Sequence, residues 1–458
     1  MSTEKSGPVA NPYEFRAQDV EAPPRTFGAT LRRIGPGLIL TASIVGSGEL
    51  IATTTLGAEV GYTLLWVILV SCVIKTAIQA LLGRYTIATG ETGLEALNHM
   101  PGPRIFALSW AVWIWAVVAF LVSLPLGGMY GGVSQVASLM LPGIDIDVWV
   151  GLFAIASLAL LLTGSYARVE FVATLMVVMF TFLTVVTAAM LVTHPEYFSW
   201  RELLEGLEFR VPDKGFVTAV AVFGITGVAA TELVLYPYWC LEKGYARFTG
   251  PRDNTQAWLD RANGWIRVMH FDIVVSLIIY TFATIAFYLL GAGVLHGMGL
   301  VPKGLEMIKT LSNTFTEILG PWGLYLFYIG AIVVLYSTIF SATAGLARQF
   351  TDMAKMGGMR SLDNFGKRLV FQRWAIVVLI IVPIAFYYVF KSPVAMVKAG
   401  GVAIALLLPV VGFSAVYLRH RRLASELAPS PWITAALWLT TVVATAGMIW
   451  YALMQVQK

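Results

Sequence analysis

Charged residues are scarce in this chain of 458 residues, where Asp, Glu, Lys and Arg together make up only 12%. In a soluble globular protein roughly a quarter of the residues are charged. Hydrophobic residues make up 58% of the chain and form long runs between short charged patches. Runs of about 18 or more apolar residues are typical of helices that cross a bilayer. The composition excludes an ordinary soluble domain and predicts a polytopic helical membrane protein.

Cysteine is nearly absent, and the motifs of common catalytic sites are missing. Cys72 and Cys240 lie in apolar segments without CxxC or Cys/His spacing, which argues against a disulfide framework or a zinc site. There is no GxxxxGK[ST] loop to bind ATP and no GxSxG nucleophile motif. We therefore expect no enzyme activity and no cofactor, and we expect any transport to run on a gradient.

The apolar runs predict eleven membrane spans. Residues 1–33 are polar and contain four prolines, which predicts a disordered cytoplasmic tail without a signal peptide. The spans are expected near residues 34–60, 63–88, 104–140, 147–164, 169–193, 215–240, 266–296, 321–347, 369–390, 393–418 and 430–454. They form one transporter domain over 34–455, with a first repeat at about 34–193, a second at about 215–418, and an eleventh helix at about 430–454.

The net charge of +5 reflects topology rather than a nucleic-acid surface. Most Lys and Arg residues fall in alternate loops, including residues 243–267 and the run "LRHRR" at 418–422. An excess of basic residues marks cytoplasmic loops. We therefore expect the N-terminus in the cytoplasm, the C-terminus outside, and a bacterial-type plasma membrane as the location. The expected partners are the bilayer and a small-molecule or ion substrate, with no nucleic acid.

Two spans carry glycines and a glutamate where an unbroken apolar helix is expected. The first reads "TASIVGSGELIATT" over residues 41–54, with Gly46, Gly48 and Glu49. The sixth reads "AVFGITGVAATELVLYPYW", with Gly227 and Glu232. A single "GSG" is typical of close helix packing. Its recurrence about five spans later, again beside a carboxylate, favours two broken helices of an inverted-repeat transporter with its binding site near the midplane.

Candidate site residues surround these two breaks. The expected substrate-binding residues are Gly46, Ser47, Gly48, Glu49, Thr226, Gly227, Ala229, Ala230, Thr231 and Glu232. Glu49 and Glu232 are the candidate metal ligands, because a carboxylate inside a membrane is costly and suggests a function. Three further polar residues lie in mid-span and are candidates for coupling or charge compensation: Lys75, Tyr336 and Ser337. Snorkelling of Lys75 and simple packing of Tyr336 and Ser337 are the alternatives.

Several segments resemble the Nramp family of divalent-metal transporters. The stretch from "IGPGLILTASIVGSGELIATT" to "LLGRYTIATG" is similar to the family's first two helices, with "GYTLLWVILVS" the most specific part. "RVEFVATLMVVMF" looks like the fifth helix and "STIFSATAGLARQF" like the eighth. The resemblance covers about residues 34–420. It implies an all-α LeuT-type fold with two inverted five-helix repeats, helices 1 and 6 broken at mid-membrane, and one extra helix.

The chain departs from the family at the expected metal ligands. Metal-transporting Nramps carry Asp-Pro-Gly-Asn in the first helix, where this chain has Gly46 to Glu49. Their Met-Pro-His in the sixth helix aligns with Ala229, Ala230 and Thr231. The acid that the family places in the third helix for proton movement has no counterpart between Arg104 and Pro142. The resemblance thus implies a divergent member with a rebuilt or lost site, and weak or no proton coupling.

Three functions stay open at this stage. An all-oxygen site around the two glutamates suits a hard divalent cation such as Mg²⁺ or Mn²⁺. Alternatively, the Gly46–Gly48 backbone holds the carboxylate of a small organic solute such as an amino acid, because helix N-termini bind anions. The third possibility is a sensor or scaffold that no longer transports.

Overall fold

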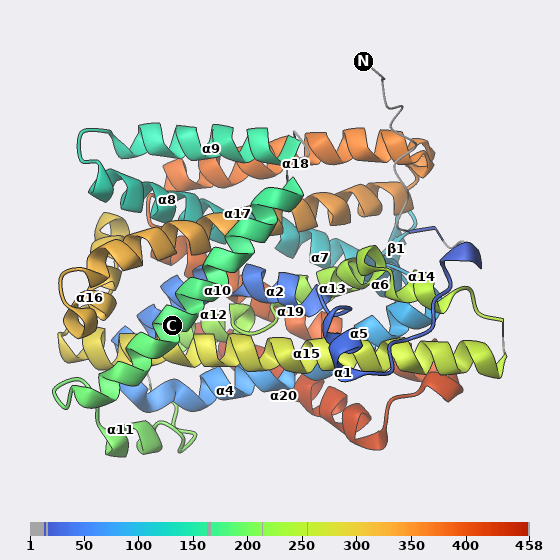
Figure 1. The fold of residues 1–458 in the computed structure, drawn as a ribbon, viewed down its shortest axis with the longest axis horizontal. Coiled ribbons are helices and arrows are strands. Elements are labelled where there is room, and N and C mark those ends of the chain that lie inside the picture. The colour runs from blue at the N-terminus through green and yellow to red at the C-terminus, as the bar shows by residue number, and fades with distance from the viewer. Residues whose placement is uncertain (1–12, 15–16, 163–165, 213, 254, 457–458) are drawn as a thin grey trace.

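The structure of the chain is a computed structural model that describes residues 13–14, 17–162, 166–212, 214–253 and 255–456. Within these residues, helices and short connections make up the fold, apart from one hairpin of two short strands (Figure 1). Apolar segments form helices in a membrane because a helix pairs its backbone N–H and C=O groups within itself. The predicted all-α class is confirmed.

The elements of the first half run from the N-terminal segment to a short helix that precedes the sixth span. They are η1 (Ala17–Asp19), α1 (Phe27–Leu31), α2 (Pro36–Ile44), η2 (Ser47–Thr53), α3 (Thr54–Val60), η3 (Gly61–Leu64), α4 (Leu65–Ile74), α5 (Thr76–Thr89), α6 (Gly93–Asn98), β1 (Arg104–Ile105), β2 (Leu108–Ser109), α7 (Trp110–Leu121), α8 (Ser123–Met140), α9 (Ile146–Leu162), α10 (Tyr166–Met190), η4 (Leu191–Thr193) and α11 (Trp200–Glu205). The element η2 is a π-helix.

The second half contains the longer helices. Its elements are α12 (Phe216–Ile225), α13 (Ala230–Lys243), α14 (Tyr245–Thr249), α15 (Gln256–Leu290), η5 (Gly291–Leu295), η6 (Gly304–Glu306), α16 (Met307–Leu319), α17 (Gly323–Met356), η7 (Arg360–Asp363), α18 (Phe365–Phe390), α19 (Pro393–Arg421), η8 (Ser425–Leu427) and α20 (Pro431–Val456). The element η5 is also a π-helix.

Nine helical segments of the described residues are long and apolar enough to cross a membrane. The first, Gly48–Thr89, makes two passes because it reverses at Gly61, where φ is +62°. Tyr288 donates a hydrogen bond to the Gly61 carbonyl (2.8 Å), and Tyr280, two turns earlier on α15, donates to the Cys72 carbonyl (3.2 Å). The chain therefore runs along α15 in both directions. With the shorter apolar helix α9, the described passes reach the eleven that the sequence predicts.

Three predicted spans have clearly different bounds in the structure: the third, the seventh, and the eighth, which was expected to end at residue 347 but continues in α17 to Met356. The third was expected from residue 104, but Arg104 pairs with Ser109 in the β1–β2 hairpin and α7 begins only at Trp110. The Arg104 guanidinium donates to the carbonyls of Asn98 and Ala107, which keeps this polar turn outside the span. The seventh was expected from residue 266, but α15 already begins at Gln256.

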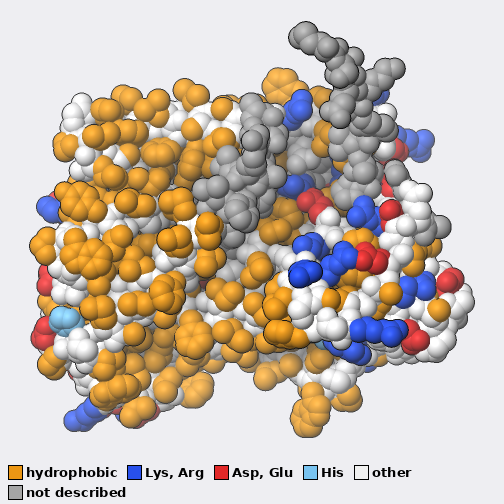
Figure 2. Space-filling model, viewed as in Figure 1, with side chains coloured by type: hydrophobic (Ala, Val, Ile, Leu, Met, Phe, Trp, Pro, Cys, Tyr) orange, Lys and Arg blue, Asp and Glu red, His pale blue; other side chains and the backbone are white. Residues whose placement is uncertain are grey.

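The long helices pack around a continuous apolar core. Helix α12 packs along α19, and α8 contacts α17, α18 and α19. Helix α10 crosses α15 and α17 and lies obliquely in front of the other helices in Figure 1. Hydrophobic side chains also cover much of the outer face, as Figure 2 shows in orange. An apolar outside as well as an apolar inside is expected of a helix bundle in lipid.

Part of the N-terminal segment packs against the bundle. Residues 1–12, 15 and 16 of the expected tail lie outside the described residues. Further along, the Glu21 N–H donates to the Phe248 carbonyl (3.0 Å), and the Trp265 indole N–H donates to the Glu21 carbonyl (3.0 Å). These two hydrogen bonds place the Glu21 backbone against α14 and α15.

Candidate functional site

The first break lies between α2 and η2. Helix α2 ends at Ile44, and the next two residues leave helical backbone angles before the π-helix begins at Ser47. A Cβ at Gly46 would lie 2.1 Å from the hydroxyl oxygen of Thr338 on α17, so close packing requires glycine here. The Thr338 hydroxyl lies within hydrogen-bond distance (3.3 Å) of the Ser43 carbonyl oxygen. A neutral hydroxyl therefore serves the C-terminal end of α2.

Glu49 caps the N-terminal end of the half-helix that follows the first break. Its Oε2 accepts the Gly46 N–H (3.4 Å), and its Oε1 accepts the Thr284 hydroxyl of α15 (3.2 Å). The side chain is fully buried. A helix N-terminus has unpaired N–H groups and a partial positive charge, so a carboxylate in its first turn stabilises it. Glu49 is thus engaged by its own helix and by α15.

Glu232 has the equivalent position at the second break. Helix α12 ends at Ile225, the chain turns through Gly227 (φ +61°), and α13 begins at Ala230. Glu232 Oε2 accepts the Ala229 N–H (3.2 Å). Its Oε1 accepts the Ser43 hydroxyl (3.0 Å) from the end of α2. This bond joins the two breaks.

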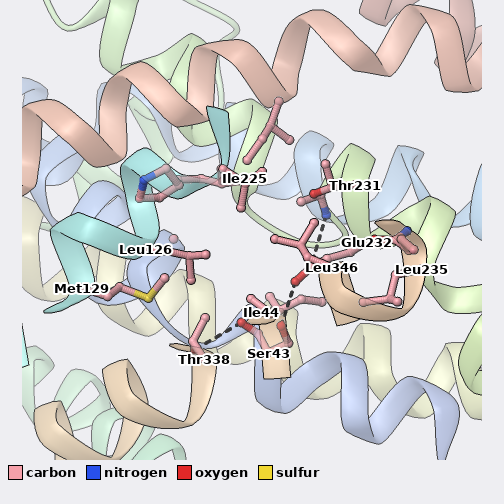
Figure 3. A pocket seen from close by; sticks show the side chains of 17 residues that line it. Ser43, Ile44, Leu126, Met129, Ile225, Thr231, Glu232, Leu235, Thr338 and Leu346 are labelled. Atoms are coloured by element: carbon pink, nitrogen blue, oxygen red, sulfur yellow. Dashed lines mark hydrogen bonds between the residues drawn. The ribbon is translucent and has the colours of Figure 1, made fainter. Parts of the chain in front are cut away.

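A cavity of about 80 Å³ lies where the two breaks meet (Figure 3). Its walls come from α2, η2, α8, the second break, α13, α17 and α19: Ser43, Ile44, Gly48, Val122, Pro125, Leu126, Met129, Ile225, Ala229, Thr231, Glu232, Leu235, Thr338, Ala342, Leu346, Gln349 and Ile404. Figure 3 shows Ser43, Thr338 and Glu232 linked through hydrogen bonds, with the Met129 sulfur apart from them. The wall is mostly apolar but carries several polar groups, and the volume leaves room for a small ion with waters or for a small organic group.

The structure brings together some of the predicted site residues and separates others. Gly48, Ala229, Thr231 and Glu232 line the cavity, whereas Gly46, Glu49, Thr226, Gly227 and Ala230 shape the breaks without lining it. The Ser47 side chain lies outside the described residues. The two predicted metal ligands have different neighbours, since Glu49 faces α15 and Glu232 faces α2. Over the described part of the chain, no group of three or more His, Cys, Asp and Glu side chains is placed to hold a metal.

The eighth-span candidates, Tyr336 and Ser337, do not line the cavity. The Tyr336 hydroxyl donates to the Phe153 carbonyl on α9 (3.2 Å), and the Ser337 hydroxyl donates within α17 to Val334 (3.0 Å). The next residue, Thr338, faces the cavity. Sequence reasoning also missed Ser43 and Gln349 in the cavity wall. For Ser43 a signal existed, because it is a hydroxyl residue in the last turn before the break.

Lys75 lies at the joint between α4 and α5 and is fully buried. Its ammonium donates to the Phe223 carbonyl (2.8 Å) and to the Thr226 carbonyl at the C-terminal end of α12. A helix C-terminus has unpaired C=O groups and a partial negative charge, which a cation stabilises. The sequence left open whether Lys75 pairs with a site carboxylate, and its hydrogen bonds go to backbone carbonyls instead.

Ion pairs tie the helices together beyond the cavity. Along α13 and α17, Arg348 donates to Glu242 (2.7 Å) and its guanidinium lies 4.9 Å from the centre of the Trp239 ring. Along α3, Lys398 of α19 pairs with Glu59. The two pairs lie beyond different breaks, since α13 follows the second break and α3 follows the first.

The chain matches a family model over residues 37–454, and that model is described as natural resistance-associated macrophage protein-like. One relative is the divalent metal cation transporter MntH of Bacillus subtilis, 23% identical over 433 residues, with 92% of each chain covered. Another is MntH of Burkholderia ambifaria, 26% identical over 322 residues, which cover 70% of this chain and 67% of the relative.

Solved structures show the same fold at low identity. A manganese transporter from Eremococcus coleocola, solved as a mutant, aligns with a TM-score of 0.58 and 14% identity, covering 95% of this chain and 90% of that one. Mhp1, a nucleobase-cation-symport-1 family transporter, aligns with a TM-score of 0.57 and 14% identity, covering 92% and 93%. The predictions of a LeuT-type fold and of an Nramp-related transporter are confirmed. This chain belongs to the natural resistance-associated macrophage protein-like family.

Proposed function

We propose that the protein moves a hard divalent cation, Mg²⁺ or Mn²⁺, across the membrane and binds it at Glu232. The observation that carries the proposal is the Glu232 carboxylate, which lines the cavity and is hydrogen-bonded to both broken helices. Mg²⁺ keeps much of its water and needs only one or two carboxylates. One carboxylate in a cavity with room for water suits such an ion.

The other polar groups of the cavity support a hard cargo. Ser43, Thr231, Thr338 and Gln349 supply hydroxyl and amide oxygens, which hard cations prefer to sulfur. Met129 brings one thioether to the wall from α8, away from the Ser43–Glu232 pair. We therefore expect Met129→Leu to leave Mg²⁺ and Mn²⁺ binding unchanged. A softer cargo such as Cd²⁺ would lose affinity in that variant and would argue for a sulfur ligand.

Alternating access at these breaks gives the transport mechanism. Rocking of one repeat against the other opens the cavity to one side at a time. Release at each side then needs the corresponding pair to separate, Arg348 from Glu242 or Lys398 from Glu59. Since the third span has no acid for proton movement, we propose that the cation gradient itself drives transport.

An organic amine is the second candidate cargo. Much of the cavity wall is apolar, with Leu126, Ile225 and Leu235 beside one carboxylate, and this arrangement also suits a small ammonium compound. A solute carboxylate at Gly46 would have to displace Glu49, because Glu49 already accepts the Gly46 N–H. An amine without a carboxylate therefore fits better than an amino acid.

The test is thermal stability of the purified protein with Mg²⁺, Mn²⁺, Ca²⁺ and small amines. A ligand that binds only the folded state raises Tm in a saturable way. We expect Mg²⁺ or Mn²⁺ to raise Tm in wild type and in Glu49→Gln but not in Glu232→Gln, and liposomes with wild type to take up the same ion. A shift with an amine and with no divalent cation would overturn the metal proposal in favour of the second candidate. No response to any ligand would favour a non-transporting protein.

We also propose that the N-terminus is cytoplasmic and the C-terminus outside. Figure 2 shows the blue basic side chains mainly at one end of the visible face, where Figure 1 places α1 and α14. The positive-inside rule makes that end cytoplasmic. A cysteine at exposed Ser425, between α19 and α20, should react with an impermeant thiol reagent only after the cells are opened. A cysteine at exposed Glu208 should react in intact cells, and the reverse pattern would invert the topology.

A further inference from the structure

Two carbonyl oxygens contact the Lys75 ammonium at the C-terminal end of α12, and two hydroxyl oxygens lie beside them. Besides the Phe223 and Thr226 carbonyls that the ammonium contacts, Ser71 Oγ lies 3.3 Å from each of these two carbonyl oxygens. The Thr226 hydroxyl oxygen lies 2.8 Å from Ser71 Oγ. The Phe223 ring faces the ammonium from 5.4 Å. We call these four oxygens and the ring the Lys75 cage.

The Lys75 cage has the chemistry of a binding site for an alkali cation. Carbonyl and hydroxyl oxygens replace the water of a small hard ion. In transporters with broken helices, the C-terminal end of a half-helix coordinates the coupling cation with its unpaired carbonyls. Here the ammonium of Lys75 occupies that place. The partial negative charge of the helix end acts on it as it would act on a free ion.

The positive charge of Lys75 interacts with acidic side chains, in addition to the hydrogen bonds that its ammonium donates. A buried ammonium is costly, and a neutral donor would satisfy two carbonyls at less cost. Lys75 is fully buried, yet it interacts electrostatically with both Glu232 and Glu49. The interaction is reciprocal for Glu232, so the charge of Lys75 acts chiefly on the carboxylate that lines the cavity.

We propose that Lys75 is a resident cation whose removal uncovers a binding site for a small monovalent cation such as Na⁺ or K⁺. The side chain carries the charge that a co-transported ion would otherwise bring to α12. Cargo transport by wild type then needs no monovalent cation, a consequence that rests on the proposed function. The cage itself is independent of what the cargo is.

Thermal stability of the full-length protein tests the cage. Lys75→Ala removes the ammonium and leaves the four oxygens. In choline chloride, which is too large to enter, its Tm should lie well below that of wild type. Replacing choline by Na⁺, K⁺ or methylammonium should raise it in a saturable way, by about 2 °C or more. Wild type should not distinguish these salts.

Lys398→Ala is the matched control. Lys398 is also a lysine, but it pairs directly with the Glu59 carboxylate, whereas the Lys75 ammonium donates to carbonyl oxygens. The Tm of Lys398→Ala should fall without recovery in Na⁺. Equal stability of Lys75→Ala in all salts would overturn the proposal. If Lys75→Ala cannot be purified, Lys75→Ser, which keeps a small polar group, is measured instead, and the same salt independence would overturn the proposal.

Transport separates this proposal from the proposed function. Liposomes with wild type should take up Mn²⁺ equally fast in Na⁺, K⁺ and choline. Liposomes with Lys75→Ala should take up Mn²⁺ about tenfold more slowly in choline than in Na⁺ or K⁺. If wild type responds to no divalent cation but the salt response of Lys75→Ala persists, the metal proposal fails and the resident cation stands. If Mn²⁺ uptake by wild type requires Na⁺, the resident-cation proposal is wrong, while the proposed divalent cargo stands.

Discussion

The two breaks are alike on one side and different on the other. Beyond each break, a glutamate in the first helical turn accepts a backbone N–H at the start of the half-helix: Glu49 from Gly46, and Glu232 from Ala229. Before each break the helix end is served differently. At the first it meets the neutral Thr338 hydroxyl, and at the second it meets the charged Lys75 ammonium.

This difference shows how one topology produces a one-sided site. Glu49 is fully buried and accepts hydrogen bonds from the Gly46 N–H and the Thr284 hydroxyl, and it does not line the cavity. Glu232 shares its position relative to the break but borders the cavity. A repeated backbone arrangement therefore does not require repeated chemistry. The side chains that fill the spaces around each break decide which carboxylate meets the cargo.

The largest effect is expected from removing the charge at the second break. Lys75→Met keeps the length of the side chain but removes the ammonium that donates to the Phe223 and Thr226 carbonyls, and with it the positive charge that acts on Glu232. We expect a loss of about 3 kcal/mol in unfolding free energy, because the variant loses two buried hydrogen bonds from a charged donor. Denaturant unfolding in mixed micelles measures it. Lys398→Met, at a less buried pair, should lose about 1 kcal/mol or less, and equal losses would contradict a special role for Lys75.

At the first break, stability should depend on the size of the side chain at residue 46 and not on a charge. Gly46→Ala places a Cβ 2.1 Å from the Thr338 hydroxyl oxygen, which predicts a loss of about 2 kcal/mol. Gly48→Ala is the control, because the nearest atom to its Cβ would lie at 3.5 Å, an ordinary contact. Thermal melting of both variants is the measurement. Adding Thr338→Ala to Gly46→Ala should restore part of the stability, and no recovery would place the strain elsewhere.

A pair of glutamine variants sharpens the comparison of the two glutamates. Each of Glu49→Gln and Glu232→Gln weakens the cap of a half-helix, so each should cost about 1 kcal/mol in stability. Only Glu232→Gln should also abolish Mn²⁺ or Mg²⁺ binding, measured by calorimetry on purified protein. Loss of binding in both variants would mean that the two carboxylates act on one ion, as the sequence analysis expected.

The smallest effect concerns the neutral hydroxyl of the first break. Thr338→Val keeps the shape and removes the donor, which the Ser43 carbonyl shares with that of Val334. We expect a loss of about 1 kcal/mol. Ser337→Ala, which removes a hydroxyl bound within its own helix turn, should change Tm less. A larger loss of Tm in Ser337→Ala than in Thr338→Val would mean that the contact between the Thr338 hydroxyl and the Ser43 carbonyl contributes little to stability.

The sequence predicted the positions of the breaks well, because glycines and carboxylates in apolar helices have few explanations. Gly46, Gly227, Glu49 and Glu232 all lie at or beside interruptions in the structure. The order of the spans followed from hydropathy, and the fold from resemblance. These features depend on local composition, which a single chain displays directly.

The direction of each side chain could not be predicted in the same way. One residue along a helix turns a side chain by about 100°, so Ser337 and Thr338 face different neighbours although they are adjacent. The π-helix η2 changes this phase again, and nothing in "GSGELIATT" shows which way Glu49 points. The carbonyl partners of Lys75 on α12 are about 150 residues away along the chain.

One hydrogen bond from the last helix, α20, bears on whether the chain can be shortened. The Thr440 hydroxyl of α20 donates to the Ile74 carbonyl (2.6 Å), directly before Lys75. The Ile78 N–H, which would take that carbonyl in a regular helix, bonds to the Lys75 carbonyl instead. The helices of the two repeats therefore leave the Ile74 carbonyl to a donor from α20. A protein shortened to this symmetric core would lose the support under its buried charge, and designs based on the repeat unit need a substitute for α20.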